Sequence, residues 1–121
     1  MSRNRHTILV VDDDHDLRQS LCEILEEEGF ETLGASNGKE AIALLKSGDH
    51  PHPRVILLDI MLPQMTGLDV MDHLRRDISF GKTPIIFMTA FRTLVKTDEK
   101  SRVIYKPFSI DRVLAAIRKA C

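Results

Sequence analysis

Several features are scarce in this 121-residue chain: tryptophan is absent, cysteine occurs twice, and 17 basic side chains almost balance 18 acidic ones, giving a formal net charge of -1. No uninterrupted apolar run approaches the ~18 residues of a membrane-spanning helix. Residues 1–6 lead into only four apolar residues before Asp12, too few for a secretory signal. We therefore expect no membrane span. Nucleic-acid binding depends largely on neutralising phosphates, so the near-zero net charge also leads us to expect no direct nucleic-acid binding by this segment.

The two cysteines form neither a disulfide framework nor a metal-ligand pair. Cys22 lies among apolar residues at helical spacing, and Cys121 is the last residue. This usage favours a reduced, cytoplasmic setting with Cys22 as a packing residue. Four histidines lack metal-ligand spacing and are expected on the solvated surface; they are His15, His50, His52 and His73.

Short apolar runs alternate with segments of helical period along the whole chain. The runs cover residues 8–11, 55–58, 85–88 and 103–105, with a weaker one at 32–35. Unbroken runs suit strands buried on both faces, and their alternation with helices implies parallel strands joined by right-handed crossovers. Asn37 and Ser109 are expected helix caps, and Gly29 a helix stop. The sequence predicts one α/β domain over residues 1–121, an open three-layer sandwich with residues 1–6 flexible.

One interval between strands is short. The first four runs begin at about residues 8, 32, 55 and 85, whereas the fifth begins only 18 residues after the fourth. The segment from Thr89 to Arg102 has 14 residues, both ends included, which is barely above the ~10 to 12 that a parallel crossover requires. The helix between the fourth and fifth strands is therefore expected to be short or irregular.

Charged or polar side chains follow four of the five runs. Asp12 and Asp13 follow the first run, Asp59 the third, Thr89 the fourth and Lys106 the fifth. The carboxyl ends of parallel strands share one edge of the sheet, where ligands bind. Three carboxylates gathered there repel one another unless a hard divalent cation takes their oxygens as ligands, and Mg²⁺ fits best.

The remaining two groups suit a phosphoryl group. Thr89 can donate a hydrogen bond, and Lys106 carries a compact positive charge on a flexible stem. An aspartate in such a pocket could attack phosphorus while metal and ammonium stabilise the equatorial oxygens. Asp14, beside the acidic pair, is interpreted as an ordinary helix cap.

Four segments of the sequence resemble one known family. ILVVDDD (8–14), LDIMLPQMTG (58–67), MTA (88–90) and KPF (106–108) are similar to the receiver domain of two-component response regulators. The resemblance covers nearly the whole chain. It implies a flavodoxin-like, open, doubly wound five-stranded parallel sheet with strand order 2-1-3-4-5.

The resemblance also assigns roles to residues. It implies Mg²⁺ held by Asp12, Asp13, Asp59 and the backbone carbonyl of Met61, with Asp59 as phosphoacceptor. Thr89 would hydrogen-bond the phosphoryl group and Lys106 would pair with it, followed by a cis Lys106-Pro107 peptide. The implied partners are a sensor histidine kinase or phosphotransfer protein, and a downstream protein or output domain. Such a domain is not an enzyme, beyond promoting its own phosphorylation and dephosphorylation.

Two departures from the family concern the readout of phosphorylation. Val103 stands where members usually carry an aromatic residue, three positions before the lysine, and the aromatic residue here is Tyr105. The segment from Thr89 to Lys106 is also about five residues shorter than is typical of the family. These departures motivate one alternative, a pseudo-receiver that signals without phosphate. Another alternative, a small phosphatase of the haloacid-dehalogenase type with Asp12 as nucleophile, is opposed by Asp59.

Overall fold

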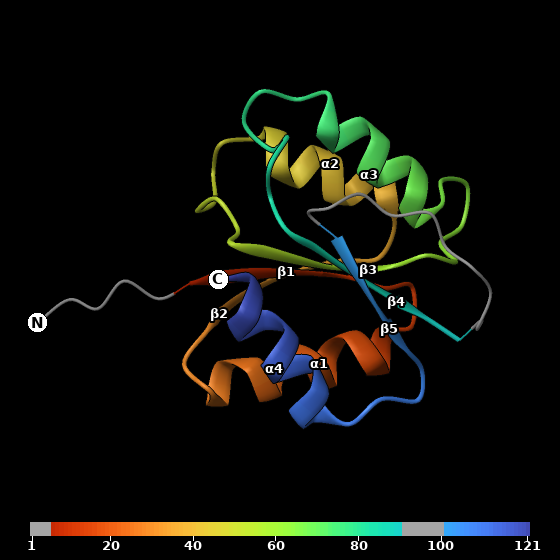
Figure 1. The fold of residues 1–121 in the computed structure, drawn as a ribbon. Coiled ribbons are helices and arrows are strands. Elements are labelled where there is room, and N and C mark those ends of the chain that lie inside the picture. The colour runs from red at the N-terminus through yellow and green to blue at the C-terminus, as the bar shows by residue number, and fades with distance from the viewer. Residues whose placement is uncertain (1–5, 91–100) are drawn as a thin grey trace, which may run out of the picture.

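The computed structural model describes residues 6–90 and 101–121 and contains a parallel five-stranded sheet (Figure 1). The strands are β1 (Thr7–Val11), β2 (Glu31–Ala35), β3 (Val55–Asp59), β4 (Ile85–Thr89) and β5 (Ser101–Tyr105). Their order across the sheet is β2-β1-β3-β4-β5, and every neighbouring pair is parallel. The predicted fold class and strand order are confirmed, including the weak second strand.

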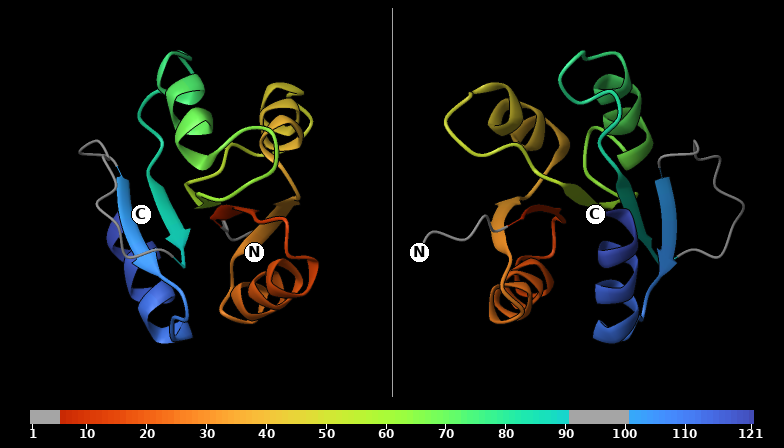
Figure 2. Two further views of the ribbon diagram at one scale, coloured as in Figure 1. Left: turned by 90° about the vertical axis from the view of Figure 1, so that its right-hand side faces the viewer. Right: turned by 60° about the vertical axis from the view of Figure 1, so that its left-hand side comes forward.

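Helices cover both faces of the sheet. They are α1 (His15–Glu27), α2 (Gly38–Lys46), α3 (Gly67–Arg75) and α4 (Ile110–Ala120). Figure 2 shows α1 and α4 on one face and α2 and α3 on the other. The helix expected between β4 and β5 falls on residues 91–100, outside the described residues, so the label α4 belongs here to the C-terminal helix.

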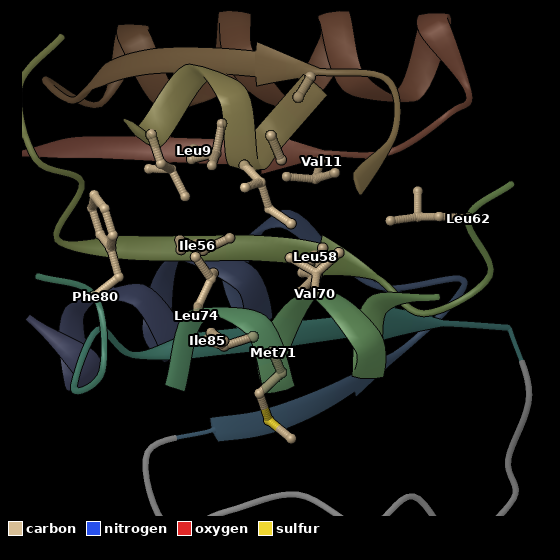
Figure 3. Close-up of a cluster of buried hydrophobic side chains, with 14 of the residues drawn as sticks. Leu9, Val11, Ile56, Leu58, Leu62, Val70, Met71, Leu74, Phe80 and Ile85 are labelled. Carbon is tan, nitrogen blue, oxygen red and sulfur yellow. The ribbon is translucent and has the colours of Figure 1, made fainter. Parts of the chain in front are cut away.

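The core is divided into two clusters because alternate residues of a strand point to opposite faces. Leu9, Val11, Ile56 and Leu58 face α2 and α3, and Figure 3 shows this cluster from Phe80, where β3 begins, to Leu62 beyond its end. The other face buries residues such as Ile8, Val10 and Leu57 against α1 and α4. The strands β1, β3 and β4 are fully buried and are the three central strands of the sheet. Their carboxyl ends therefore lie side by side at the centre of one edge of the sheet.

Side-chain caps define where the helices begin. The predicted caps Asp14, Asn37 and Ser109 each accept a hydrogen bond from a backbone amide three residues ahead. Thr66 caps α3 and forms a reciprocal capping box with Asp69, which the sequence reasoning did not identify. Gly29 follows α1 with a left-handed φ of 97°, as expected of a helix stop.

Cys22 is a packing residue as expected, whereas the flexibility expected for residues 1–6 stays a prediction. Cys22 is half-buried and packs against the α1 and α4 cluster. The carbonyl of His6 accepts a hydrogen bond from the Glu31 amide at 3.0 Å, whereas residues 1–5 lie outside the described range. Among the described helices, none is both long and apolar enough to cross a membrane.

The edge at which the strands begin, here called the amino edge, includes the loop before β3 (residues 47–54), on the left of Figure 1, and the loop before β4 (residues 76–84), at its top. His52 of one loop stacks on Phe80 of the other, with ring centroids 4.6 Å apart. The ring nitrogens of His52 lie 3.0 Å from the Pro53 carbonyl and 2.8 Å from the Ser79 carbonyl. His52 is exposed, as predicted, but its ring is fixed between the loops rather than simply solvated.

Candidate metal centre

The candidate metal centre lies at the opposite edge, where the strands end, here called the carboxyl edge. The sheet hydrogen bonds continue past the strand ends and position the residues that follow them. The Asp12 amide bonds the Ala35 carbonyl at 3.1 Å, and the Lys106 amide bonds the Thr89 carbonyl at 2.7 Å. Because β1 and β3 are neighbours in register, Asp12 and Asp59 meet side by side.

Three carboxylates converge at this edge as predicted. One oxygen of each of Asp12, Asp13 and Asp59 lies within 4.8 Å of the others. Asp12 is fully buried and Asp59 is 5% exposed, whereas Asp13 faces solvent. Across residues 6–90 and 101–121, this is the one group of three acidic, histidine or cysteine side chains that could share a metal ion. Hard carboxylate oxygens with one solvent-facing member fit Mg²⁺, which takes few protein ligands and keeps waters.

Lys106 bridges the two buried carboxylates. Its Nζ lies 3.0 Å from Asp12 Oδ2 and 3.3 Å from Asp59 Oδ2. Burial alone would lower the pKa of Lys106, but its hydrogen bond to Asp12 and the charges of Asp12 and Asp59 raise that pKa overall. One ammonium therefore stands against three carboxylates, and the cluster keeps an excess of negative charge.

The charge of Asp59 is only partly compensated by its neighbours. Burial, and next the charge of Asp12, raise the pKa of the Asp59 carboxyl, although Lys106 and the Met61 amide act in the opposite direction. The remaining positive charge that would stabilise this carboxylate has to come from a bound cation.

Each buried carboxylate is held in the same way. One oxygen accepts a backbone amide two residues ahead: the Asp14 amide bonds Asp12 Oδ1 at 2.9 Å, and the Met61 amide bonds Asp59 Oδ1 at 3.1 Å. The other oxygen faces Lys106. These turns fix both side chains without using the further lone pairs that a metal ion or a phosphoryl group needs.

The loop after β3 returns very close to the strand at Gly67, which the sequence reasoning quoted only as part of a motif. A Cβ at Gly67 would lie 2.5 Å from the Asp59 carbonyl oxygen and 2.9 Å from the Ile60 Cα. The Gly67 amide bonds the Ile60 carbonyl at 2.9 Å, and Gln64 adopts a left-handed φ of 67° within the loop. Only glycine permits this approach, which fixes the backbone immediately after Asp59.

A second residue missed by sequence reasoning is Arg18 on α1. Its guanidinium donates to the Asp12 carbonyl oxygen at 2.7 Å, and its stem packs over Gly34 of β2. The only signal for it is its place one helical turn after the cap Asp14.

The other predicted site residues lie at the same edge. Thr89 is buried at the end of β4, and the Lys106-Pro107 peptide is cis, as predicted. The Met61 side chain is exposed and its amide holds Asp59, while the role of its carbonyl as a ligand stays a prediction. So does the hydrogen bond from Thr89 to a phosphoryl group.

The fold and this edge define a flavodoxin-like α/β protein with an acidic cluster that could hold a metal ion where the strand order reverses, between β1 and β3. The chain belongs to the response regulator receiver domain family, whose model matches residues 8–118. It is thus a signalling domain of two-component regulatory systems, which makes the phosphatase alternative wrong.

Individual relatives agree with this assignment. The DNA-binding response regulator MtrA of Mycobacterium tuberculosis is 36% identical over 98% of this chain. The chain spans 51% of MtrA and 24% of the Escherichia coli regulatory protein AtoC, so it covers about half or less of these relatives.

Solved structures show the same fold. Chemotaxis response regulator CheY4 of Vibrio cholerae has a TM-score of 0.84 at 25% identity, covering 98% of this chain and all of that one. Response regulator TrrA of Thermotoga maritima, solved in complex with Mg²⁺-BeF, has a TM-score of 0.81 at 32% identity, covering 96% of this chain and 99% of that one.

Proposed function

We propose that this receiver domain accepts a phosphoryl group on Asp59 from the phosphohistidine of a sensor histidine kinase or phosphotransfer protein, with Mg²⁺ as cofactor. The single observation that carries the proposal is the convergence of Asp12, Asp13 and Asp59 within 4.8 Å, with Lys106 bridging the two buried members. The complex of the Thermotoga relative with Mg²⁺-BeF supports the choice of metal.

In the proposed reaction, an Asp59 oxygen forms a bond to phosphorus while the phosphorus–nitrogen bond to the donor imidazole breaks. The imidazole keeps the electron pair of that bond and takes up a proton from solvent. Mg²⁺, when held by Asp12, Asp13, Asp59 and the Met61 carbonyl, would neutralise charge on the phosphoryl oxygens.

The chain's own residues position and stabilise the group. The Met61 amide orients Asp59, and the Lys106 ammonium, already between the two carboxylates, would pair with the transferred phosphoryl group. The Thr89 hydroxyl would donate a hydrogen bond to it. Hydrolysis of the acyl phosphate by water would return the domain to its unphosphorylated form. In this proposal the domain promotes its own phosphorylation and dephosphorylation and acts on no other substrate.

Phosphorylation would bias a protein-interaction surface read by a downstream protein or output domain. We expect this to take place in the cytoplasm, without direct nucleic-acid contact by these residues. The named DNA-binding activity of MtrA refers to a protein about twice as long as this chain.

Transfer from acetyl phosphate tests the proposal directly. With Mg²⁺ present, intact mass measurement should show one added phosphoryl group on the wild type and on Asp77→Asn, a matched change at the amino edge. Asp59→Asn should gain none. Equal mass gain by Asp59→Asn would contradict the proposal, as would a wild type that gains nothing.

A second measurement separates the pseudo-receiver alternative, which Val103 and the short β4–β5 interval favour. Under phosphorylating conditions, binding of the cognate downstream protein should differ between the wild type and Asp59→Ala. Identical binding would show that the fold signals without phosphate.

A further inference from the structure

The amino edge carries three hollows that the proposed phosphoryl chemistry does not use. The first, of about 370 Å³, lies between the end of α2 and the His52–Phe80 stack. The second, of about 690 Å³, follows the loop that contains Ile78 and Lys82, and the third, of about 260 Å³, lies beside His73 and Arg76. Asp77 lines all three, so the hollows adjoin one another, and together they are here called the amino-edge groove.

The charge of the groove is opposite to that of the carboxyl edge. Among the residues that the structure describes, five cationic side chains line it, against a single acidic one, Asp77, in a chain whose net charge is -1. The cationic side chains are Lys46, Arg54, Arg75, Arg76 and Lys82. Asp77 already accepts the Ser79 amide at 2.8 Å. The groove therefore presents a surplus of positive charge to solvent.

The walls of the groove are fixed in place. His52 stacks on Phe80 and contacts the Ser79 carbonyl, which joins loops 27 residues apart in sequence. Arg75 donates to the Thr83 carbonyl at 2.8 Å and closes the turn before β4. A surface held in this way loses little conformational freedom when a ligand binds, which favours affinity.

The groove also has an apolar component. Leu44, Leu45 and Phe80 line the hollow beside α2, and Ile78 on the rim is fully exposed. Ile78 lines the second hollow, where its exposed side chain offers apolar contact area that has no stabilising role in the fold.

We propose that the amino-edge groove docks an acidic peptide segment of a partner protein. A large apolar side chain of that segment would occupy the hollow beside α2, and a neighbouring residue of the segment would contact Ile78 in the second hollow. Its flanking Asp and Glu residues would meet Lys46 and Arg76 on one side and Arg54 and Lys82 on the other.

A nucleic acid suits the groove less well. Asp77 stands at the junction of the three hollows, where it would repel a continuous line of phosphates. Phe80, the one Phe, Tyr or Trp among the lining residues, is buried and offers no exposed face for base stacking.

Selection from a displayed library of short peptides on the wild-type protein tests the proposal without assuming a partner. Recovered binders should be enriched in Asp and Glu and should carry a large apolar residue. The double variant Lys46→Glu/Lys82→Glu should bind these peptides about tenfold or more weakly than the wild type does, because two exposed contacts change from attraction to repulsion. The control Lys39→Glu/Arg112→Glu reverses two exposed cations at the carboxyl edge and should leave affinity within about twofold.

A milder variant guards against loss of folding in the charge reversal. Ile78→Ser changes a fully exposed side chain and should lower the affinity for the selected peptides about threefold. The amide NMR spectrum of this variant should match that of the wild type, which shows that it is folded. Chemical shifts on peptide addition should change at Lys46, His52 and Ile78. The same peptides should bind Asp59→Asn as they bind the wild type, so failure here is distinct from failure of phosphorylation.

Three results would overturn the proposal. The first is a selection that yields no binder sensitive to Lys46→Glu/Lys82→Glu. The second is a set of binders without acidic enrichment. The third is a short DNA duplex that binds more tightly than every peptide with the same sensitivity, which would assign the groove to nucleic acid instead.

Discussion

The two edges of the sheet carry opposite charge, which is mostly buried at the carboxyl edge and mostly exposed at the amino edge. At the carboxyl edge, three carboxylates meet one ammonium, and two of the carboxylates are buried. At the amino edge, cations surround one carboxylate, and Lys46, Arg54, Arg76 and Lys82 are exposed. A buried charge is stable only while its hydrogen-bond and ion-pair partners stay in place, because it has lost its solvation. An exposed charge is solvated, and its ion pairs contribute little to stability. Matched changes should therefore have large effects at the first edge and small ones at the second.

The largest difference in unfolding free energy is expected between alanine substitutions of two glycines, one at each edge. A Cβ at Gly67 would meet the Asp59 carbonyl at 2.5 Å inside the buried loop, so Gly67→Ala should cost about 2–3 kcal/mol of unfolding free energy. A Cβ at Gly81 would meet the Asp77 carbonyl oxygen at 2.9 Å and the Arg75 carbonyl oxygen at 3.3 Å, a milder overlap than at Gly67, so Gly81→Ala should cost only about 1 kcal/mol. Urea unfolding followed by circular dichroism measures both. Equal costs would remove the distinction between the edges.

Metal affinity should distinguish matched aspartates. Asp12→Asn removes a charge from the candidate metal centre, and Mg²⁺ affinity should fall tenfold or more, equivalent to about 1.4 kcal/mol or more. Asp77→Asn removes the same charge at the amino edge and should leave affinity unchanged. Titration calorimetry provides the measurement. Mg²⁺ binding that survives Asp12→Asn would place the cation elsewhere.

Stability should respond to pH through Asp59. Since its folded-state pKa is raised, the folded chain holds this proton more tightly than the unfolded chain does. The wild type should then lose stability relative to Asp59→Asn as pH rises from the ordinary carboxyl range through the raised pKa. At neutral pH without Mg²⁺, the variant should therefore be the more stable of the two.

Mg²⁺ supplies the control for this effect. At about ten times its Kd it should add about 1.4 kcal/mol to the wild type and much less to Asp59→Asn. A wild type that gains stability over the variant as pH rises, without metal, would contradict the assigned direction.

The smallest expected effect is at His52. His52→Ala removes the stack on Phe80 and the contact with the Ser79 carbonyl and should cost about 0.5–1.5 kcal/mol. Mg²⁺ affinity should not change, because the edges are separated by the length of the strands. His50→Ala, at an exposed position in the same loop, should stay within about 0.5 kcal/mol of the wild type. Altered Mg²⁺ affinity in His52→Ala would show that the edges are coupled.

The sequence was sufficient for features that follow from local pattern. Buried strands appear as unbroken apolar runs, and a parallel sheet brings the residues after those runs to one edge, so Asp12, Asp13 and Asp59 could be placed together. Asn37 and Ser109 were recognisable because a cap interacts only with its own helix.

Contacts between distant segments were not predictable in the same way. The close approach of Gly67 to Asp59 depends on the path of a loop, and the bond from Arg18 to the Asp12 carbonyl depends on how α1 packs on the sheet. His52 carries no sequence signal for its stack on Phe80, because the two residues belong to different loops. The helix expected between β4 and β5 lies outside the described residues.

The position of Cys121 determines how this domain can be attached to a sensor surface. Its thiol is exposed and lies near Arg54, whereas Cys22 is half-buried. Coupling through a maleimide would orient immobilised molecules uniformly, with the acidic cluster toward the flowing analyte and the groove toward the matrix. Such a chip would suit kinase binding and would mask peptide docking, which calls for the reverse orientation.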